Sequence, residues 1–146
     1  MQGIKTSQLR FAVVLDTKAG ALPQLLRLAK LGLAARFGSG QQPFAWISSQ
    51  DLVRAIDWVI SAHLTGAINC VAPQILTQDQ FNSALCRHLH RLYFLKIPVR
   101  LVQWIFGQMG DELLLRGPIG SPTVLENAGF VFNTPDFVSF LEQSLA

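Results

Sequence analysis

Residues 9–15 read LRFAVVL, and this run decides the fold class. Every position after Arg10 is apolar, which is typical of a strand in a parallel sheet that helices cover on both faces. A second run, AINCVAP at residues 67–73, has the same character and is stopped by Pro73. Helical periodicity follows each run, so the sequence predicts an α/β fold with few parallel strands.

Three long helices are predicted around these strands. The first covers residues 22–31. The second begins after Ser48, because Ser48 and Asp51 fit the S-x-x-D capping pattern, and the third begins after Thr77, which can form a capping box with Gln80. Their expected apolar faces are, in chain order, Leu22, Leu25, Leu26 and Ala29; Leu52, Ile56, Val59 and Ile60; and Phe81, Leu85, Leu89 and Leu92.

The remaining segments are short, and the segment at residues 98–106 is apolar almost all round. An all-round apolar helix is expected to be buried or in a contact. The tail is expected to hold short helices near residues 111–115 and 122–128, an extended GFVF run at 129–132, and a final helix begun by Pro135.

The length of 146 residues suits one domain. We expect a single domain over residues 1–146. Residues 9–75 would form late β–α units of a Rossmann-like sheet, and residues 76–146 would form a mostly helical subdomain.

Composition limits the partners. Half of the residues are hydrophobic and only 14% are charged, against about 25% in an average soluble domain. Such a chain is expected to associate with itself or with a partner chain. No apolar run is long enough to cross a bilayer, and the first ten residues lack a signal-peptide core, so we expect a cytoplasmic protein without a membrane partner.

Charge and cysteine content exclude two further classes. The twelve basic residues are spread singly from Lys5 to Arg116, unlike the clusters that bind nucleic acid, so no nucleic-acid partner is expected. Cys70 and Cys86 are too few for a disulfide framework and are expected to be reduced thiols.

Four motifs suggest chemistry, but each fails a spacing test. GSGQQP at residues 38–43 places Pro43 where a dinucleotide loop needs its third glycine, and GPIGSP at 117–122 fails similarly. Tyr93 and Lys96 are one residue short of a Y-x-x-x-K pair. CRHLH at 86–90 has no second cluster to complete a tetrahedral metal site. We therefore expect no catalytic, cofactor-binding or metal-binding residues in this chain alone.

Six blocks occur in a recognisable order: LRFAVVL, GAL, GSGQQPFAWISSQDLVRAI, GAINCVAP, FGQMGDELLL and GFVFNTPDF. In this order and spacing the chain resembles the C-terminal half of the YfcH-like epimerase family. These proteins are atypical extended short-chain dehydrogenase/reductases of the NAD-dependent epimerase/dehydratase type. The resemblance implies an N-terminal Rossmann half, which binds NAD(P) and carries a Tyr/Lys pair, followed by a smaller substrate-side half. We expect the nucleotide-binding half to be absent from this sequence.

The resemblance also implies a substrate cleft beside residues 38–46. Gln41 and Gln42 would offer amide hydrogen bonds, Trp46 a stacking face, and Ser48 stands where the family commonly has histidine. Physical reasoning alone allows a second interpretation, in which the same residues are a turn and a strand that lead into a capped helix. Both interpretations stay open at this point.

Other positions depart from the family pattern. Residues 16–18 read Asp-Thr-Lys where a glycine-rich continuation is expected, and Gln108 stands where glutamate is common. Asp51 matches the family's acidic position, and its expected role is a favourable charge at a helix N-terminus.

Two functions follow. The first is a substrate-side C-terminal domain of an NAD(P)-dependent epimerase, dehydratase or reductase-like protein, inactive alone and able to receive a small-molecule substrate once a Rossmann half complements it. The alternative is a non-catalytic interaction module that associates through an exposed apolar strand edge or through the helix at 98–106.

Overall fold

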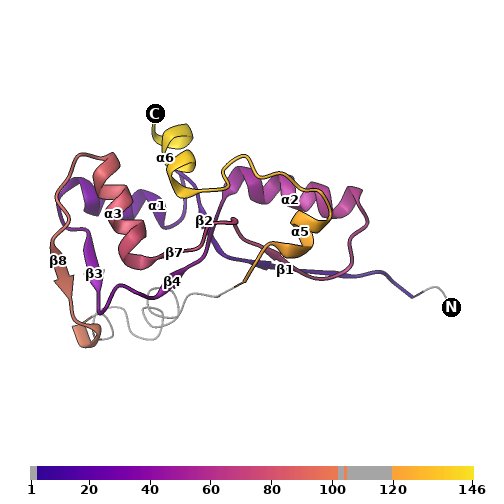
Figure 1. The fold of residues 1–146 in the computed structure, drawn as a ribbon, viewed down its shortest axis with the longest axis horizontal. Helices are drawn as coiled ribbons and strands as arrows, with labels where there is room; N and C mark the ends of the chain where they lie inside the picture. The colour runs from indigo at the N-terminus through magenta and orange to yellow at the C-terminus, as the bar shows by residue number, and fades with distance from the viewer. Residues whose placement is uncertain (1–2, 102–103, 105–119) are drawn as a thin grey trace.

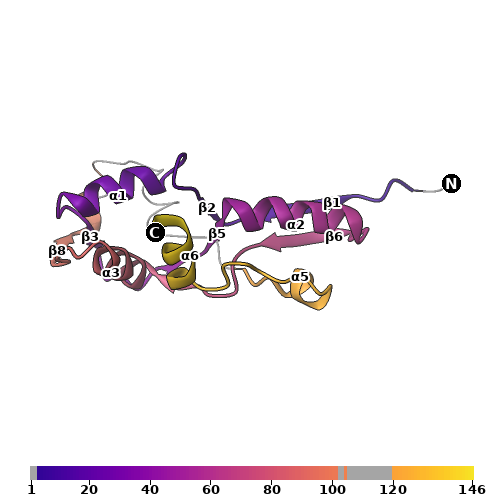
Figure 2. The ribbon, with the colours of Figure 1, turned by 90° about the horizontal axis from the view of Figure 1, so that it is seen from above.

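The structure is a computed structural model, and it describes residues 3–101, 104 and 120–146 (Figure 1). The molecule is elongated. β1, β6 and α2 lie toward one end, β3, β8, α1 and α3 lie toward the other, and α6 lies between them (Figures 1 and 2). The elements are β1 (Ser7–Phe11), β2 (Val13–Leu15), α1 (Leu22–Lys30), β3 (Ala35–Phe37), β4 (Pro43–Phe44), β5 (Trp46–Ser48), α2 (Ser49–Ser61), β6 (Gly66–Cys70), β7 (Leu76–Thr77), α3 (Gln78–His88), β8 (Leu95–Ile97), α5 (Thr123–Asn127) and α6 (Phe137–Leu145).

The run at residues 9–15 contributes to two strands with different partners. β1 pairs in parallel with β6, and β2 pairs in parallel with β5. The change of partner falls at Ala12, whose N–H donates to the Cys70 carbonyl at 3.2 Å, whereas the Val13 N–H donates to the Ala45 carbonyl at 3.2 Å. The predicted parallel strands are therefore present, but the single expected strand is broken.

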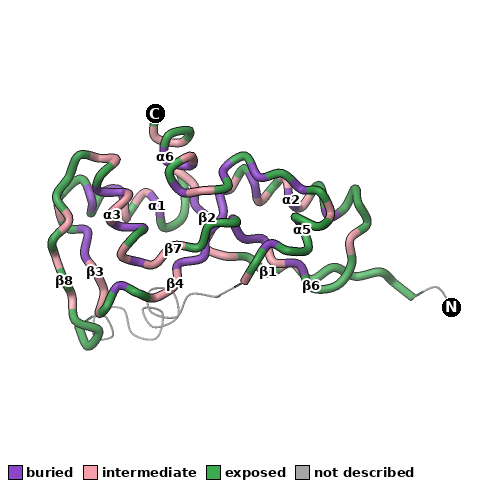
Figure 3. The backbone as a smooth tube through the Cα atoms, viewed as in Figure 1, coloured by how far each residue is buried: buried purple, intermediate pink, exposed green. Residues whose placement is uncertain are grey.

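The expectation that this run is covered on both faces is wrong for β1. Phe11 is 50% exposed, and most of the strand is exposed along its length (Figure 3). Within the described residues β1 pairs with β6 alone. Leu9 packs against the cluster that contains Val59 and Ile68, so only one face of β1 is covered. Leu15 of β2, by contrast, is fully buried.

Two further strand pairs organise the other end. β3 and β8 are parallel, with Ala35 opposite Leu95, and β4 and β7 are antiparallel. The apolar side chains form two clusters. One is built on α1, α3 and α6 around Leu22, Phe81 and Phe137. The other lies under α2 and includes Ile47, Ile68 and Leu125.

Local capping explains where the helices begin. The Ser48 hydroxyl accepts from the Asp51 N–H at 3.1 Å, and Thr77 and Gln80 exchange both hydrogen bonds of a capping box. The predicted helix starts are thereby confirmed, as is the helix over residues 22–30.

Two predicted apolar faces are partly wrong. Ile60 is 66% exposed, because the buried face of α2 runs through Asp51, Ala55 and Val59. Leu92 lies beyond the end of α3 and is also exposed. The buried face of α2 was mispredicted because it includes a carboxylate, which a hydrophobic pattern cannot reveal.

The tail follows the expectation in part. The helix predicted near residues 122–128 is α5, and the GFVF run, predicted as extended, takes part in no strand pair of the described residues. Phe130 and Phe132 are nevertheless buried in the α2 cluster. The last helix begins at Phe137 rather than at Pro135, because the Asp136 carboxylate caps it by accepting from the Ser139 N–H at 2.9 Å.

Some predictions lie wholly or partly outside the described residues. These are the helix near residues 111–115, the first half of the turn at 117–122, part of the helix at 98–106, and Gln108. Residues 99–101 and 104 are helical. In the described part of the chain, no helix has the length and apolar composition required to cross a bilayer. Cys70 and Cys86 are free and buried.

Candidate functional site

The glycine loop at residues 38–42 is held against the start of α3. The Gly40 carbonyl accepts from the Asp79 N–H and the Gln42 carbonyl accepts from the Gln78 N–H, both at 2.9 Å. Gly40 has a φ of 71°, and a Cβ added there would lie 2.7 Å from Cγ of Arg36. The loop therefore satisfies amides at a helix start, and glycine is needed for close approach.

The two predicted glutamine contacts lie in different environments. Gln41 is exposed on the loop. Gln42 turns inward, where its Nε2 donates to the Phe37 carbonyl at 2.9 Å. Its Oε1 is buried and has no hydrogen-bond partner among the described residues. Gln41 is thus the more accessible of the two amides.

Trp46 and Ser48 are both buried. The Trp46 ring is fully buried, its Nε1 donates to the Gln74 carbonyl at 3.0 Å, and it meets Phe137 edge-on at a centroid distance of 5.5 Å. Ser48 caps α2 and receives a hydrogen bond from the Thr134 hydroxyl at 2.9 Å. The structure therefore does not bring the four predicted side chains to one surface, and substrate binding by them stays a prediction.

Asp51 is the centre of the buried polar network beside Ser48. Its carboxylate accepts from Nη1 of Arg54 at 2.7 Å and from the Asn133 N–H at 2.9 Å. It also accepts from the N–H and the hydroxyl of Thr134, at 2.8 and 2.7 Å. Residues 133 and 134 come from the tail, so this carboxylate ties the start of α2 to the segment that precedes α6.

Two opposing effects act on the pKa of Asp51. Burial alone would raise the pKa, but the hydrogen bonds from Asn133, Thr134 and Arg54 outweigh burial and hold it below the ordinary value of 3.8. Asp51 is therefore ionised near neutral pH. Its role includes the expected helix-start charge and extends to a long-range clamp.

A cavity of about 290 Å³ lies where β1 and β6 end. The carboxyl ends of parallel strands are where α/β proteins bind ligands. Arg10 contributes a guanidinium and Asn69 an amide, whose Nδ2 donates to the Ser121 carbonyl at 3.3 Å. The cavity is lined by Arg10, Phe11, Ala12, Ala45, Asn69, Val71 and Gly120. Arginine and asparagine side chains can bind anionic and hydrogen-bonding groups.

Comparison with known proteins gives the context for this cavity. Residues 97–144 match the family model described as Domain of unknown function (DUF1731). Epimerase family protein MT2273 of Mycobacterium tuberculosis is 38% identical over 132 residues, which are 90% of this chain and 44% of that protein. The crystal structure of human epimerase family protein SDR39U1 (isoform 2) with NADPH superposes with a TM-score of 0.86 at 31% identity, over 93% of this chain and 46% of that one.

The chain matches the C-terminal portion of epimerase family proteins. The predicted resemblance and the predicted α/β fold class are thus confirmed. The chain spans about half the length of the curated relatives it matches. The nucleoside-diphosphate sugar epimerase of Corynebacterium glutamicum is also similar, with a TM-score of 0.72 and 25% identity over 97% of this chain and 26% of that one.

The departure from the epimerase family pattern at residues 16–18 has a structural role here. Asp16 accepts from the Lys18 N–H and from the Ser49 hydroxyl, both at 2.7 Å. The Ser49 hydrogen bond is the main cause that lowers the pKa of Asp16, with the Lys18 amide second. These residues line a second cavity of about 290 Å³, between the loop after β2 and the end of α6.

Sequence reasoning missed Arg10 and Asn69. Both lie near the carboxyl end of an observed parallel strand, β1 or β6. In the predicted runs at 9–15 and 67–73 they stand near the start, so the sequence carried no strand-end signal for them. The motif search followed glycines, histidines and tyrosine–lysine spacing instead. Within the described residues, no three histidine, cysteine, aspartate or glutamate side chains come together as a metal-binding group.

Proposed function

We propose that this chain supplies the substrate-side portion of an NAD(P)-dependent epimerase, dehydratase or reductase-like protein. In this function the chain lacks activity and cofactor binding by itself, and a nucleotide-binding Rossmann portion completes it. The observation that carries the proposal is the match to the C-terminal portion of epimerase family proteins. The edge of β1 that is open in the described residues supports it.

The open edge of β1 has the geometry to receive another strand. The Gly66 N–H donates to the Thr6 carbonyl, and the Ala12 N–H donates to Cys70. Even-numbered residues of β1 therefore face β6, and Ser7, Leu9 and Phe11 direct their backbone groups toward the open edge. An unpaired strand edge of this kind is a template for strand addition.

The cavity beside this edge suits a substrate role. Arg10 and Asn69 can hold anionic and hydroxyl groups of a small molecule while the added portion holds the cofactor. Gln41 lies on the exposed glycine loop and is not among the residues that line this cavity. We place the function in the cytoplasm, where a reducing compartment is consistent with two free cysteines.

Co-expression with the N-terminal portion of the M. tuberculosis relative, which this chain does not match, tests the proposal. Size-exclusion chromatography would report a complex, and fluorescence titration would report NADPH binding by the complex and not by the chain alone. Phe11→Pro removes a backbone donor from the open edge and is expected to weaken the complex at least about ten-fold.

Phe11→Val is the matched control, since it keeps the backbone N–H. Thermal unfolding of each variant alone verifies that the fold persists. Saturable NADPH binding by the isolated chain would contradict the proposal. A complex that forms equally well with Phe11→Pro would contradict the assigned edge.

The alternative function, a non-catalytic interaction module, uses the same β1 edge and predicts a complex without cofactor binding. The exposed Phe11 side chain and the 81% exposed Trp104 motivate it. The NADPH titration of the complex therefore separates the two functions.

A further inference from the structure

One end of the molecule carries an uneven charge distribution. Residues 19–45 and 76–101 hold seven of the twelve basic residues and one of the nine acidic residues. That acidic residue is Asp79, which pairs with Arg36 at 2.6 Å. The other six basic residues of these segments are all exposed: Arg27, Lys30, Arg87, Arg91, Lys96 and Arg100.

Large apolar side chains are exposed at the same end. Leu31 and Leu33 lie on the connection from α1 to β3, and Leu92 and Phe94 lie on the connection from α3 to β8. Leu92 is 76% exposed and Phe94 is 69% exposed. The two connections lead into strands that pair in parallel, so they lie side by side. Exposed apolar side chains gathered in this way mark an interaction surface.

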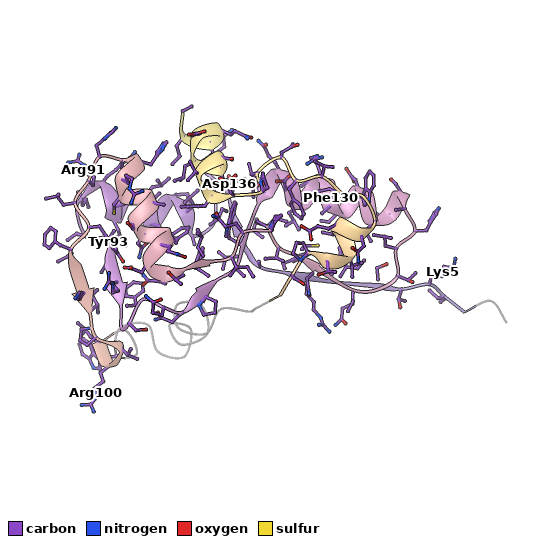
Figure 4. The ribbon with its side chains drawn as sticks, viewed as in Figure 1. Lys5, Arg91, Tyr93, Arg100, Phe130 and Asp136 are labelled. Atoms are coloured by element: carbon purple, nitrogen blue, oxygen red, sulfur yellow. The ribbon has the colours of Figure 1, made fainter. Side chains whose placement is uncertain are left out.

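Among the described residues, this surface lies away from the β1 edge. Arg91 and Arg100 lie at the end of the molecule that is opposite to Lys5, which precedes β1 (Figure 4). β3 and β8 likewise lie at the far end from β1 (Figure 1). A contact made here is therefore independent of the proposed function and of any strand added to β1.

We propose that this end, formed by the α1–β3 and α3–β8 connections and their flanking basic residues, binds anionic membrane surfaces peripherally. Exposed lysines and arginines attract anionic headgroups, and leucine and phenylalanine side chains enter the boundary between headgroups and acyl chains. The phosphates of a nucleic acid would pair with the lysines and arginines, but a nucleic acid has no hydrocarbon phase in which the exposed leucines could be buried. A peripheral contact needs no spanning segment, so this proposal differs from the expectation, based on hydropathy, that the chain has no membrane partner.

Co-sedimentation with vesicles tests this proposal on the whole 146-residue chain. The chain is expected to bind vesicles of phosphatidylcholine mixed with phosphatidylserine, and to bind pure phosphatidylcholine vesicles much more weakly. Added salt should release it, because screening weakens attraction to the anionic surface. Each of Arg91→Gln and Lys96→Gln should lower the partition coefficient about five-fold.

Apolar variants separate insertion from simple charge attraction. Phe94→Ser and Leu92→Ser should each lower the partition coefficient by roughly ten-fold or more. The matched control is Val131→Ser, because Val131 is 72% exposed and lies outside the two connections. It should bind as the unaltered chain does.

Three outcomes would overturn the proposal. The first is no binding to the mixed vesicles, which would leave an acidic protein as the partner of this surface. The second is equal binding to neutral and anionic vesicles. The third is equal loss in Val131→Ser and Phe94→Ser.

Discussion

Replacing Asp51 with asparagine tests the clamp between α2 and the tail. Asparagine has the same shape, but it exchanges one acceptor oxygen for an amide donor. The carboxylate receives four hydrogen bonds from Arg54, Asn133 and Thr134. Each carboxylate oxygen accepts two of these hydrogen bonds, so the amide nitrogen of asparagine would leave about two of the four donors without an acceptor. Each unsatisfied buried group costs about 1 to 3 kcal/mol, so the free energy of unfolding should fall by about 2 to 6 kcal/mol.

Urea denaturation measures this loss, and hydrogen exchange locates it. The Asn133 and Thr134 amides should lose protection more than the amides in the middle of α2. Asp57→Asn is the matched control, since Asp57 is exposed on the same helix and should change the free energy of unfolding by less than about 0.5 kcal/mol. A loss no larger in Asp51→Asn than in Asp57→Asn would refute the reasoning.

The pH dependence supplies a second check on Asp51. Its pKa in the folded state is below 3.8, so the unfolded chain takes up its proton first as the pH falls. The stabilisation by the carboxylate is fully present above about pH 4 and disappears as the pH falls through the folded-state pKa. The stabilities of the unaltered chain and of Asp51→Asn should therefore differ most near neutral pH and converge in acid.

Three further predictions concern the glycine loop and the third helix. Gly40→Ala should destabilise the chain more than Gly32→Ala, because both glycines have positive φ but only Gly40 would place a Cβ within 3 Å of Arg36 and Asp79; equal shifts in urea midpoint would contradict the packing argument. Thr77→Ala should lower the free energy of unfolding by about 1 kcal/mol through loss of the capping box, and an unchanged thermal midpoint would count against it. Burial is the main cause that raises the pKa of Tyr93 to about 12, so the phenol should ionise at higher pH in the folded chain than in the unfolded chain. Absorbance titration reports this residue alone, because the chain has one tyrosine. Ionisation of both states at the same pH would show that the phenol is accessible.

Some features of the candidate site could be predicted from neighbouring residues and others could not. The cap at Ser48 is visible because the Ser48 hydroxyl and the Asp51 N–H lie three residues apart. The burial of Trp46 is not visible, because it depends on Phe137, which lies 91 residues later in the chain and packs on its ring. A tryptophan after a polar loop therefore suggested a ligand face, whereas packing gave it a core role.

The sequence by itself determined the elements whose causes lie within a few residues. The apolar run at 9–15 implied parallel strands, and the capping pairs fixed the starts of α2 and α3, because backbone geometry brings residues three apart into contact. Only the tertiary structure joined Asp51 to Thr134, left one face of β1 uncovered, and brought six exposed basic residues from two distant segments to one end of the molecule. These features depend on which surfaces pack together over long chain separations, and local spacing carries no information about that choice.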